Sequence, residues 1–374
     1  MSVSVTKSGF NVREKLKQLQ KPIGLKGSEL MRAETAQEAR DFVSAGRKNM
    51  VINGDMRIWQ RANGGTVTAS DVIYMDRFSC RDNTDGTLTI GSQASSTAGP
   101  SGESFRYVMK LDCDGADTSL SSAQYARIQQ YIEGYNLNMD WGISNTDFIT
   151  LSFWVKSNKP GIYCCGIEDG DVGRIYIKEY TINSSDVWQK VELTYPPPPA
   201  GTWKNFDNST GLRITWCLGT GTTYQGSANS WGTTYVMATS RQTNFMDNAN
   251  NAFYLTGVQL EVGRNATEFE HRSYGEELAL CYRYYEKSGA QLWVNAIYAN
   301  GSYVSSGNNT LFWKVQKRAS PQFSLTFVSS IDNCNGVVST VNSDTNSAIY
   351  NLGINNITYP YCRAVCTYVA DSEL

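Results

Sequence analysis

Carboxylates gather in two turns of the sequence, and they are the side chains best placed there to do chemistry. The turn DCDGAD holds Asp112, Asp114 and Asp117, and the turn EDGDVG spans residues 168–173. Oxygen ligands suit a hard cation such as Ca²⁺, although the first turn lacks the twelfth-position Glu of an EF-hand. Two carboxylates that flank a sugar are enough for glycoside hydrolysis. A solvated turn, a structural calcium site and a catalytic pair all stay open; we favour the solvated turn and assign no metal site.

Nucleophilic catalysis by a hydroxyl or thiol usually needs a nearby base, and the chain has a single histidine, His271. Nothing near His271 supports a Ser-His-Asp arrangement, so a structural role at a domain junction is the favoured interpretation. The sequence has no P-loop, G-x-G-x-x-G, G-x-S-x-G or H-E-x-x-H motif. We therefore predict no catalytic residue, no enzyme activity and no cofactor.

Aromatic side chains offer the chemistry of a binding protein, because a flat apolar face with a polar edge suits a sugar ring. Four of them fall within about twenty residues near the C-terminus and are the candidate glycan contacts: Trp293, Tyr298, Tyr303 and Trp313. The competing interpretation, that these aromatics fill the core of a small sandwich, is the more common outcome for such residues.

Short strands separated by polar turns would have to position these side chains. Apolar and polar residues alternate in five stretches between residues 50 and 272, namely 125–134, 149–157, 187–195, 212–219 and 252–263. Frequent Tyr (22) and Gly (32) fit pleated surfaces and turns. Such strands without intervening helices predict an all-β protein, with a jelly-roll β-sandwich over 50–272.

The C-terminal part reads as a smaller unit. Residues 273–289 predict a linker with a helical turn or two, and residues 290–374 predict a small C-terminal β-sandwich that forms the tip of the protein. About 85 residues give a thin core for their surface, and neighbouring copies would remedy that. We therefore predict that the chain forms a homo-oligomer.

The N-terminal segment 1–49 has helical rather than alternating periodicity and no Trp, Tyr or Cys. Residues 1–50 carry ten Lys and Arg against five Asp and Glu, a net charge of +5, and the remaining 23 against 30 leave −7. A loosely packed leader is one interpretation; a short helical anchor that docks on a partner is the other. In the second case the anchoring side chains are Leu30, Met31, Phe42 and Val43.

The overall charge of −2 gives no reason to expect a nucleic-acid partner, which would need a basic face. No apolar run reaches the length that spans a bilayer, so we predict no membrane insertion. The nine cysteines form no C-x-x-C pair, and we expect most to be reduced in a chain made in a cytoplasm.

Several blocks of the sequence resemble a known family. The segment GLKGSELMRAETAQEARDFVSAGRKNMVINGDMRIWQR, residues 24–61, resembles the N-terminal segment of fibre-like proteins of tailed bacteriophages. LSFWVKS, NFMDNANNAFYLTGVQLEVG, ATEFEHRSYGEELALCYRYYEKS and the closing YVADSEL are similar to later landmarks of that family. The middle part also resembles carbohydrate-binding-module jelly rolls, in which a V-x-L-E-V-G strand is followed by A-T-x-F-E.

The resemblance implies a virion protein, made in the host cytoplasm, that forms a homotrimeric tail fibre or other external appendage. Its N-terminus would contact other virion proteins, and its β-domains would adsorb the particle to host cell-surface polysaccharide. A purely structural capsid or tail decoration protein is the alternative. A glycan depolymerase is a third possibility, which the absence of long β-helix repeats disfavours.

Overall fold

A computed structural model gives the structure of the chain. It describes residues 48–94, 99–170, 173–199, 201–204, 206–288, 292–297, 309–332, 338–352 and 361–373. The chain divides into two compact units, Met1–Lys48 and Asn49–Leu374. The predicted helical anchor and its residues Leu30, Met31, Phe42 and Val43 lie outside the described residues.

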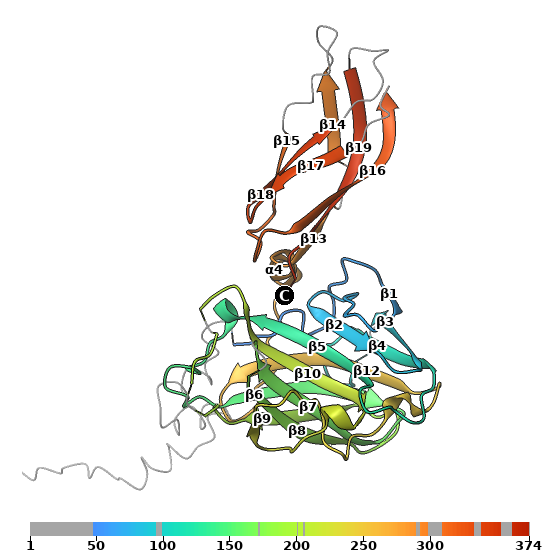
Figure 1. Ribbon diagram of the computed structural model, residues 1–374, viewed down its shortest axis with the longest axis vertical. Coiled ribbons are helices and arrows are strands. Elements are labelled where there is room, and N and C mark those ends of the chain that lie inside the picture. The colour runs from blue at the N-terminus through green and yellow to red at the C-terminus, as the bar shows by residue number, and fades with distance from the viewer. Residues whose placement is uncertain are drawn as a thin grey trace, which may run out of the picture. The chain divides into compact units, whose positions relative to one another are not determined.

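Two six-stranded antiparallel sheets form the larger sandwich (Figure 1). Sheet I has the order β1 (Gly64–Thr66), β3 (Thr87–Ala94), β4 (Tyr107–Gly115), β12 (Ala252–Val262), β6 (Ile149–Ser157), β9 (Gln189–Tyr195). Sheet II has the order β11 (Trp231–Gly232), β8 (Ile175–Ile182), β7 (Gly161–Asp169), β10 (Thr210–Thr220), β5 (Tyr125–Glu133), β2 (Phe78–Asp82). The chain passes repeatedly from one sheet to the other, as the predicted jelly roll requires.

The alternation in the sequence explains how these strands pack. In β5 the side chains of Ala126, Ile128 and Ile132 point into the core, and in β10 those of Ile214 and Trp216 do the same. Burying one large apolar side chain in this core contributes roughly 1.5 to 3 kcal/mol to the free energy of unfolding. The residues between them must therefore lie on the outer face of sheet II.

Trp216 of sheet II joins the two sheets in the middle of this core. Its ring lies 5.9 Å from Phe153 of β6, edge to face, and 6.2 Å from Phe78 of β2. Three short 3₁₀ helices, η1 (Gly134–Asn136), η2 (Thr222–Tyr224) and η3 (Phe245–Asp247), complete the larger sandwich.

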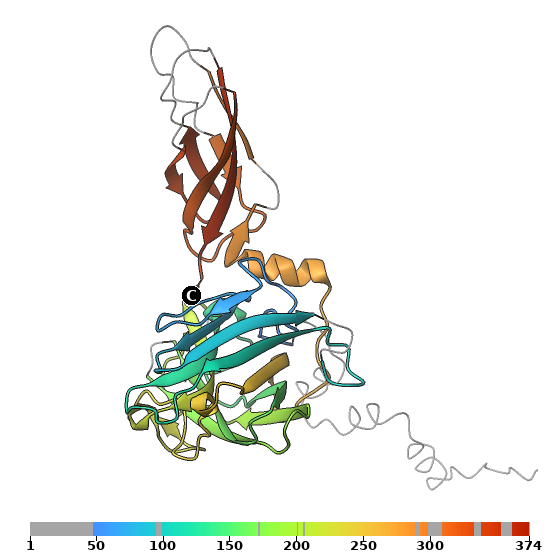
Figure 2. The ribbon, with the colours of Figure 1, turned by 90° about the vertical axis from the view of Figure 1, so that its right-hand side faces the viewer.

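Helix α4 (Tyr274–Tyr282, orange in Figure 2) leads from β12 to the C-terminal strands. Ser273 caps it, because its side chain accepts a hydrogen bond from the Glu276 amide while the Glu276 carboxylate accepts one from the Ser273 amide. β13 (Tyr285–Lys287), β19 (Tyr361–Asp371), β14 (Leu292–Ile297) and β16 (Gln322–Asp332) then form one sheet, and β15 (Asn309–Phe312), β18 (Ser347–Leu352) and β17 (Val338–Ser343) form another.

Side chains from both of these sheets share a small apolar cluster that includes Trp313, Phe323, Ala348 and Tyr368. The prediction of an all-β fold, a jelly roll followed by a smaller C-terminal sandwich, is therefore confirmed. Among the described residues, no helix is long and apolar enough to cross a bilayer.

Buried charges fasten α4 and the residues after it to the larger sandwich. Glu133, at the end of β5, is fully buried and accepts hydrogen bonds from Arg283 Nε at 2.8 Å and from the Tyr284 hydroxyl at 2.7 Å. Arg77 pairs with Glu373 and lies 3.5 Å from the Tyr284 ring centre. Because both ions of each pair are largely desolvated, removing one partner alone would be strongly destabilising.

Candidate functional site

Polar side chains cover the outer face of sheet II, opposite the core. They come from β2, β5, β7 and β10, and their positions alternate with the core residues of the same strands: Ser79, Arg81, Arg127, Gln129, Tyr131, Glu168, Arg213 and Thr215. Although this face points away from the core, several of its groups are almost inaccessible to water. We call this set the polar face.

Hydrogen bonds across neighbouring strands hold the centre of the polar face. Gln129 lies directly opposite Thr215 in the register of β5 and β10, and its amide donates to the Thr215 hydroxyl at 2.7 Å. The Tyr131 hydroxyl donates to the Gln129 amide oxygen at 3.1 Å. On its other side Thr215 lies opposite Gly166 of β7. Because glycine has no side chain, the polar face has a depression at that position.

Two arginines flank this centre, and each has an acidic partner. Arg213 pairs with Glu168 of the adjacent strand β7. Arg127 lies 3.2 Å from an Asp71 carboxylate oxygen and donates a second hydrogen bond to the Tyr235 hydroxyl. Burial raises the pKa of Glu168 above its ordinary value, and the positive charge of Arg213 opposes that shift.

Tyr131 of the polar face and Tyr235, which bonds to Arg127 of that face, stay neutral at physiological pH. Burial raises the pKa of Tyr235 to about 12, and burial also raises the pKa of Tyr131. Both rings therefore keep a hydroxyl that can donate and accept. The Arg213 guanidinium lies 4.9 Å from the Tyr131 ring centre, which gives a planar cation stacked near an aromatic face.

Several buried atoms of the polar face have no hydrogen-bond partner among the residues that the structure describes: Ser79 Oγ, Arg81 Nε, Arg127 Nε, Glu168 Oε2 and Arg213 Nε. Leaving a buried donor or acceptor unpaired costs roughly 1 to 3 kcal/mol, so native proteins rarely tolerate a group of them. A second group of such atoms lies near α4, at Asp55, Arg57, Arg77 and Arg272. The group on sheet II lies beside Tyr131 and Tyr235 and on the same face as a pocket.

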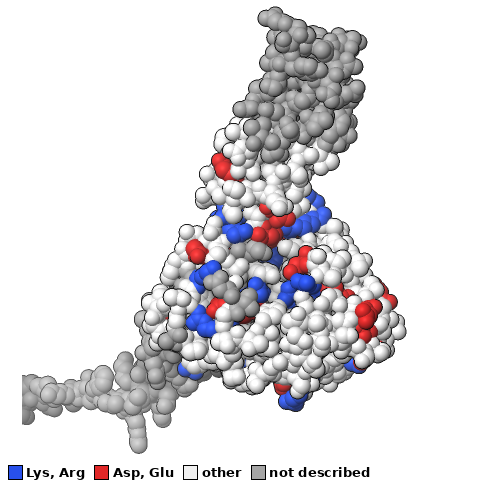
Figure 3. Space-filling view, viewed as in Figure 1, with Lys and Arg blue, Asp and Glu red and all other residues white. Residues whose placement is uncertain are grey.

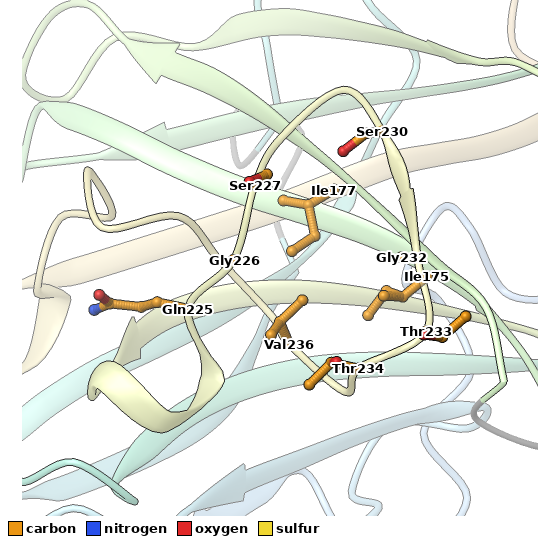
Figure 4. A pocket seen from close by; sticks show the side chains of 10 residues that line it. All are labelled: Ile175, Ile177, Gln225, Gly226, Ser227, Ser230, Gly232, Thr233, Thr234 and Val236. Atoms are coloured by element: carbon orange, nitrogen blue, oxygen red, sulfur yellow. The ribbon is translucent and has the colours of Figure 1, made fainter.

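That pocket lies over β8, beneath the segment 225–236, and has a volume of about 370 Å³ (Figure 4). Its floor is apolar and consists of Ile175, Ile177 and Val236. Ser and Thr hydroxyls surround the floor, from Ser227, Ser230, Thr233 and Thr234. The volume is at the small end of the range for pockets that bind small molecules, roughly 300 to 1,000 Å³.

The polar face and the pocket together present what recognition of a neutral polyol requires. Guanidinium, amide and hydroxyl groups converge from several strands, and tyrosine rings offer flat apolar surface beside them. Basic and acidic side chains also lie next to one another on the face of the molecule that Figure 3 shows. The arrangement can bind hydroxyl groups without a metal or a cofactor.

The prediction that Trp313 presents its ring to a ligand is wrong. Its side chain is 7% exposed, its indole N–H donates to the Asp344 carbonyl at 2.9 Å, and its ring packs on Phe323 and Tyr368. The thin sandwich needs this indole as core, which leaves no face for a sugar. The Trp293 side chain and residues Tyr298 and Tyr303 lie outside the described part of the structure, so their role as glycan contacts stays a prediction.

The acid-rich turn DCDGAD separates its carboxylates. Asp112 pairs with Lys110 at 2.8 Å, Asp114 accepts a hydrogen bond from Thr89, and Asp117 accepts from the backbone amides of Asp85 and Ser119. No group of three His, Cys, Asp or Glu side chains in the described residues is arranged to hold a metal ion. The oxygens of this turn serve local hydrogen bonds.

His271 packs its ring against Phe269 at 4.9 Å and Phe105 at 5.5 Å between ring centres. Burial, helped by the nearby Arg57, lowers its pKa below the ordinary value for histidine. The imidazole is thus neutral at physiological pH and sits among aromatic rings.

Sequence reasoning missed the residues of the polar face, although the signal was present. The stretch YARIQQYIE alternates core residues with Tyr125, Arg127, Gln129 and Tyr131, and a solvated outer face rarely carries two aromatic rings, an arginine and an amide in one strand. Its partners, Glu168 and Arg213, lie 41 and 86 positions after Arg127 and become neighbours only through strand order.

The chain matches no protein-family model and no curated protein. Among solved structures, it is similar to a putative sugar-binding protein from Bacteroides thetaiotaomicron, with 14% identity and a TM-score of 0.33 over 58% of this chain and 100% of that one. It is also similar to the family 11 carbohydrate-binding module of a Clostridium thermocellum cellulosomal cellulase, with 12% identity and a TM-score of 0.26 over 53% of this chain and 98% of that one.

A third similar structure is the enzymatically active domain of tailspike protein 4 from bacteriophage CBA120. The identity is 13% and the TM-score 0.30, over 57% of this chain. The match covers 21% of that chain, so this protein spans about a fifth of its length.

Proposed function

We propose that this chain is a carbohydrate-binding structural protein of a tailed-bacteriophage particle, and that the polar face of sheet II contacts the host surface glycan. Two independent lines support the proposal. The sequence blocks described above resemble fibre-like phage proteins, and the polar face offers converging donors, acceptors and tyrosine rings on one side of a rigid sheet.

The observation that carries the proposal is the partly exposed group of Arg81, Tyr131 and Arg213 on that face, which offers cationic donors beside an aromatic ring. Arg127 Nε, Arg213 Nε and Glu168 Oε2 are held in place by their strands yet lack a partner within the described residues. Sugar hydroxyls both donate and accept, so a glycan on this face could bond to the exposed parts of Arg81, Tyr131 and Arg213, while the buried Glu168 orients Arg213. A face that only supported folding would gain stability by losing these groups.

Binding without chemistry is part of the proposal. The carboxylates beside the face are paired with cations, Glu168 with Arg213 and Asp71 with Arg127. A glycosidase needs one free carboxylic acid and one free carboxylate across the scissile bond. We therefore retain adsorption over depolymerisation, and a test for released reducing ends decides between them.

Homotrimer formation and an N-terminal anchor complete the proposal. A single shallow sugar site binds near millimolar, about −4 kcal/mol, and linked sites raise avidity by roughly 10² to 10⁴. Three weak sites would suffice for adsorption. A monomer in native mass spectrometry would contradict this part of the proposal.

The test measures binding of the full chain to an array of bacterial polysaccharides, followed by calorimetric titration of a glycan that binds. We expect Tyr131→Ala to weaken binding at least tenfold, because it removes a ring and a hydroxyl from the polar face. The matched control is Tyr254→Ala, which removes the same side chain from the outer face of sheet I. Equal binding by both variants, or no glycan bound by the parent, would overturn the proposal and favour a decoration protein.

A further inference from the structure

The pocket over β8 differs in chemistry from the polar face beside it. Ile175 and Ile177 form a floor that is 6% and 1% exposed, and Val236 closes one side. None of the ten residues that line the pocket is charged. The Gln225 amide, which belongs to the lining, already donates to the Thr220 carbonyl at 3.1 Å.

The rim of the pocket is polar but uncharged. The hydroxyls of Ser227, Ser230, Thr233 and Thr234 are exposed, and none bonds to another residue that the structure describes. Figure 4 shows these side chains around Ile177 and Val236. A carboxylate or phosphate on the apolar floor would lose its hydration without a countercharge, which is strongly unfavourable. The pocket therefore fits a small neutral group with an apolar end.

Strand register places the pocket one strand away from the polar face. Ile175 lies opposite Glu168, and Ile177 lies opposite Gly166, in the pairing of β7 with β8. Neighbouring strands are about 4.8 Å apart, so one sugar residue could contact both regions. Tyr235, which bonds to Arg127, also stands in the segment between Thr234 and Val236 that line the pocket.

We infer that this pocket receives a methyl-bearing, uncharged substituent of the bound glycan, an acetyl group or the methyl group of a 6-deoxy sugar, while the sugar ring lies on the polar face. The inference rests on the proposed function and names the glycan class: neutral, and acetylated or deoxygenated. The methyl group would lie on Ile175, Ile177 and Val236, and the rim hydroxyls would bond to an acetyl carbonyl or to neighbouring sugar hydroxyls.

The experiment compares matched sugar pairs by ligand-observed NMR titration of the full chain. The first pair is the methyl glycosides of N-acetylglucosamine and glucose, and the second is those of D-fucose and D-galactose. We expect the methyl-bearing member to bind about fourfold more tightly, the factor for one buried methyl-sized group, and its methyl protons to receive the strongest saturation transfer. A preference in the first pair alone assigns the acetyl group, and a preference in both assigns the methyl group itself.

Two variants test whether the pocket causes the preference for the methyl-bearing sugar. Thr234→Trp, at an exposed rim position, should fill the pocket and remove the preference, and Val236→Thr should reduce it while keeping the shape of the floor. Lys156→Ala on sheet I serves as the control and should leave the preference unchanged. A preference that survives both pocket variants, or equal binding of both members of each pair, overturns the inference while glycan binding itself stands.

Other results would overturn the proposed glycan site on the polar face without overturning the assignment of the pocket. If Tyr131→Ala leaves all binding unchanged but Thr234→Trp removes the methyl preference, the pocket assignment is retained and the polar face is not the glycan site. If no sugar binds at tens of millimolar and no polysaccharide binds on the array, both are overturned.

Discussion

The two outer faces of the larger sandwich use the same strand alternation to different ends. On sheet I, Tyr254 lies opposite Lys110 in one neighbouring strand and opposite Lys156 in the other. The Lys156 ammonium is 4.2 Å from the Tyr254 ring centre and 5.2 Å from that of Trp188. These side chains are partly exposed. On sheet II, the polar face is mostly buried and keeps unpaired donors and acceptors.

The outer face of sheet I therefore stabilises the folded protein, whereas the polar face of sheet II lowers its stability. Exposed cation–π contacts contribute about 0.5 to 1 kcal/mol, and water satisfies whatever they leave free. Buried polar atoms without partners lower stability instead. Places where a sequence departs from the rules of stable packing are expected to be functional, and sheet II has that property.

The largest expected effect comes from breaking the ion pair on the polar face. Arg213→Ala leaves Glu168, whose side chain is 2% exposed, as an uncompensated buried charge, so the free energy of unfolding should fall by about 3 to 5 kcal/mol at pH 7. Lys156→Ala on sheet I should lower it by less than about 1 kcal/mol. Urea denaturation of both variants measures the contrast.

A paired replacement checks the physical reason. Arg213→Met combined with Glu168→Leu removes both charges and keeps apolar volume, so its stability should be close to that of the parent or higher. If the double variant is as unstable as Arg213→Ala, packing rather than charge sets the cost, and the contrast between the two faces is lost.

The second prediction concerns pH. The folded pKa of Glu168 lies above its unfolded value near 4.5, because burial disfavours the carboxylate. The folded protein then binds the proton more tightly than the unfolded chain, so the contribution of Glu168 to stability is full below about pH 4.5 and is lost as pH rises through the folded pKa. Relative to Glu168→Gln, the parent should lose stability as pH rises from 4.5 toward 7.

Unfolding free energies measured at several pH values for both proteins give the difference directly. Its slope cannot exceed about 1.4 kcal/mol per pH unit for one proton. A difference that grows in the opposite direction would mean that Arg213 outweighs burial and that Glu168 is an ordinary stabilising ion pair. The polar face would then resemble sheet I in its energetics.

The sequence predicted the architecture better than the site, for physical reasons. Period-two alternation is local, so segments such as 125–134 and 212–219 identify β5 and β10 directly. Whether the outward residues meet water or a covering segment depends on contacts between distant parts, such as Tyr235 with Arg127. Trp313 was predicted to contact a ligand but lies in the core, because a small sandwich needs its aromatic side chains to fill its interior. The sequence alone could not identify the site, because Arg213 and Glu168 become neighbours only through the order of the strands in the sheet.

The third prediction uses two glycines close together in one strand region. A Cβ at Gly166 would lie 3.6 Å from the Tyr176 carbonyl oxygen, an ordinary contact, whereas a Cβ at Gly170 would lie 1.7 Å from the Thr210 carbonyl oxygen. Gly166→Ala should therefore raise the free energy of unfolding by about 0.5 to 1 kcal/mol, as expected when glycine is replaced inside a strand. Gly170→Ala should lower it.

Glycan binding, in contrast to stability, should become weaker when a side chain is added at Gly166. Gly166→Val adds a branched side chain to the low centre of the polar face, so it should weaken glycan binding severalfold in the same calorimetric titration while the protein stays folded. Unchanged binding would show that the glycan does not cross this position.

The smallest expected effect on glycan binding is on sheet I and concerns Tyr254. Its ring lies between two ammonium groups, 4.2 Å from Lys156 and 5.8 Å from Lys110, and meets Trp188 edge to face at 6.2 Å. Tyr254→Ala should lower the free energy of unfolding by about 1 kcal/mol, the sum of an exposed cation–π contact and some apolar area. Part of that loss is electrostatic and should shrink in high salt, because exposed charges are screened. Glycan affinity should stay within twofold of the parent in calorimetry. A tenfold loss of affinity in Tyr254→Ala, with Tyr131→Ala unaffected, would move the binding face from sheet II to sheet I.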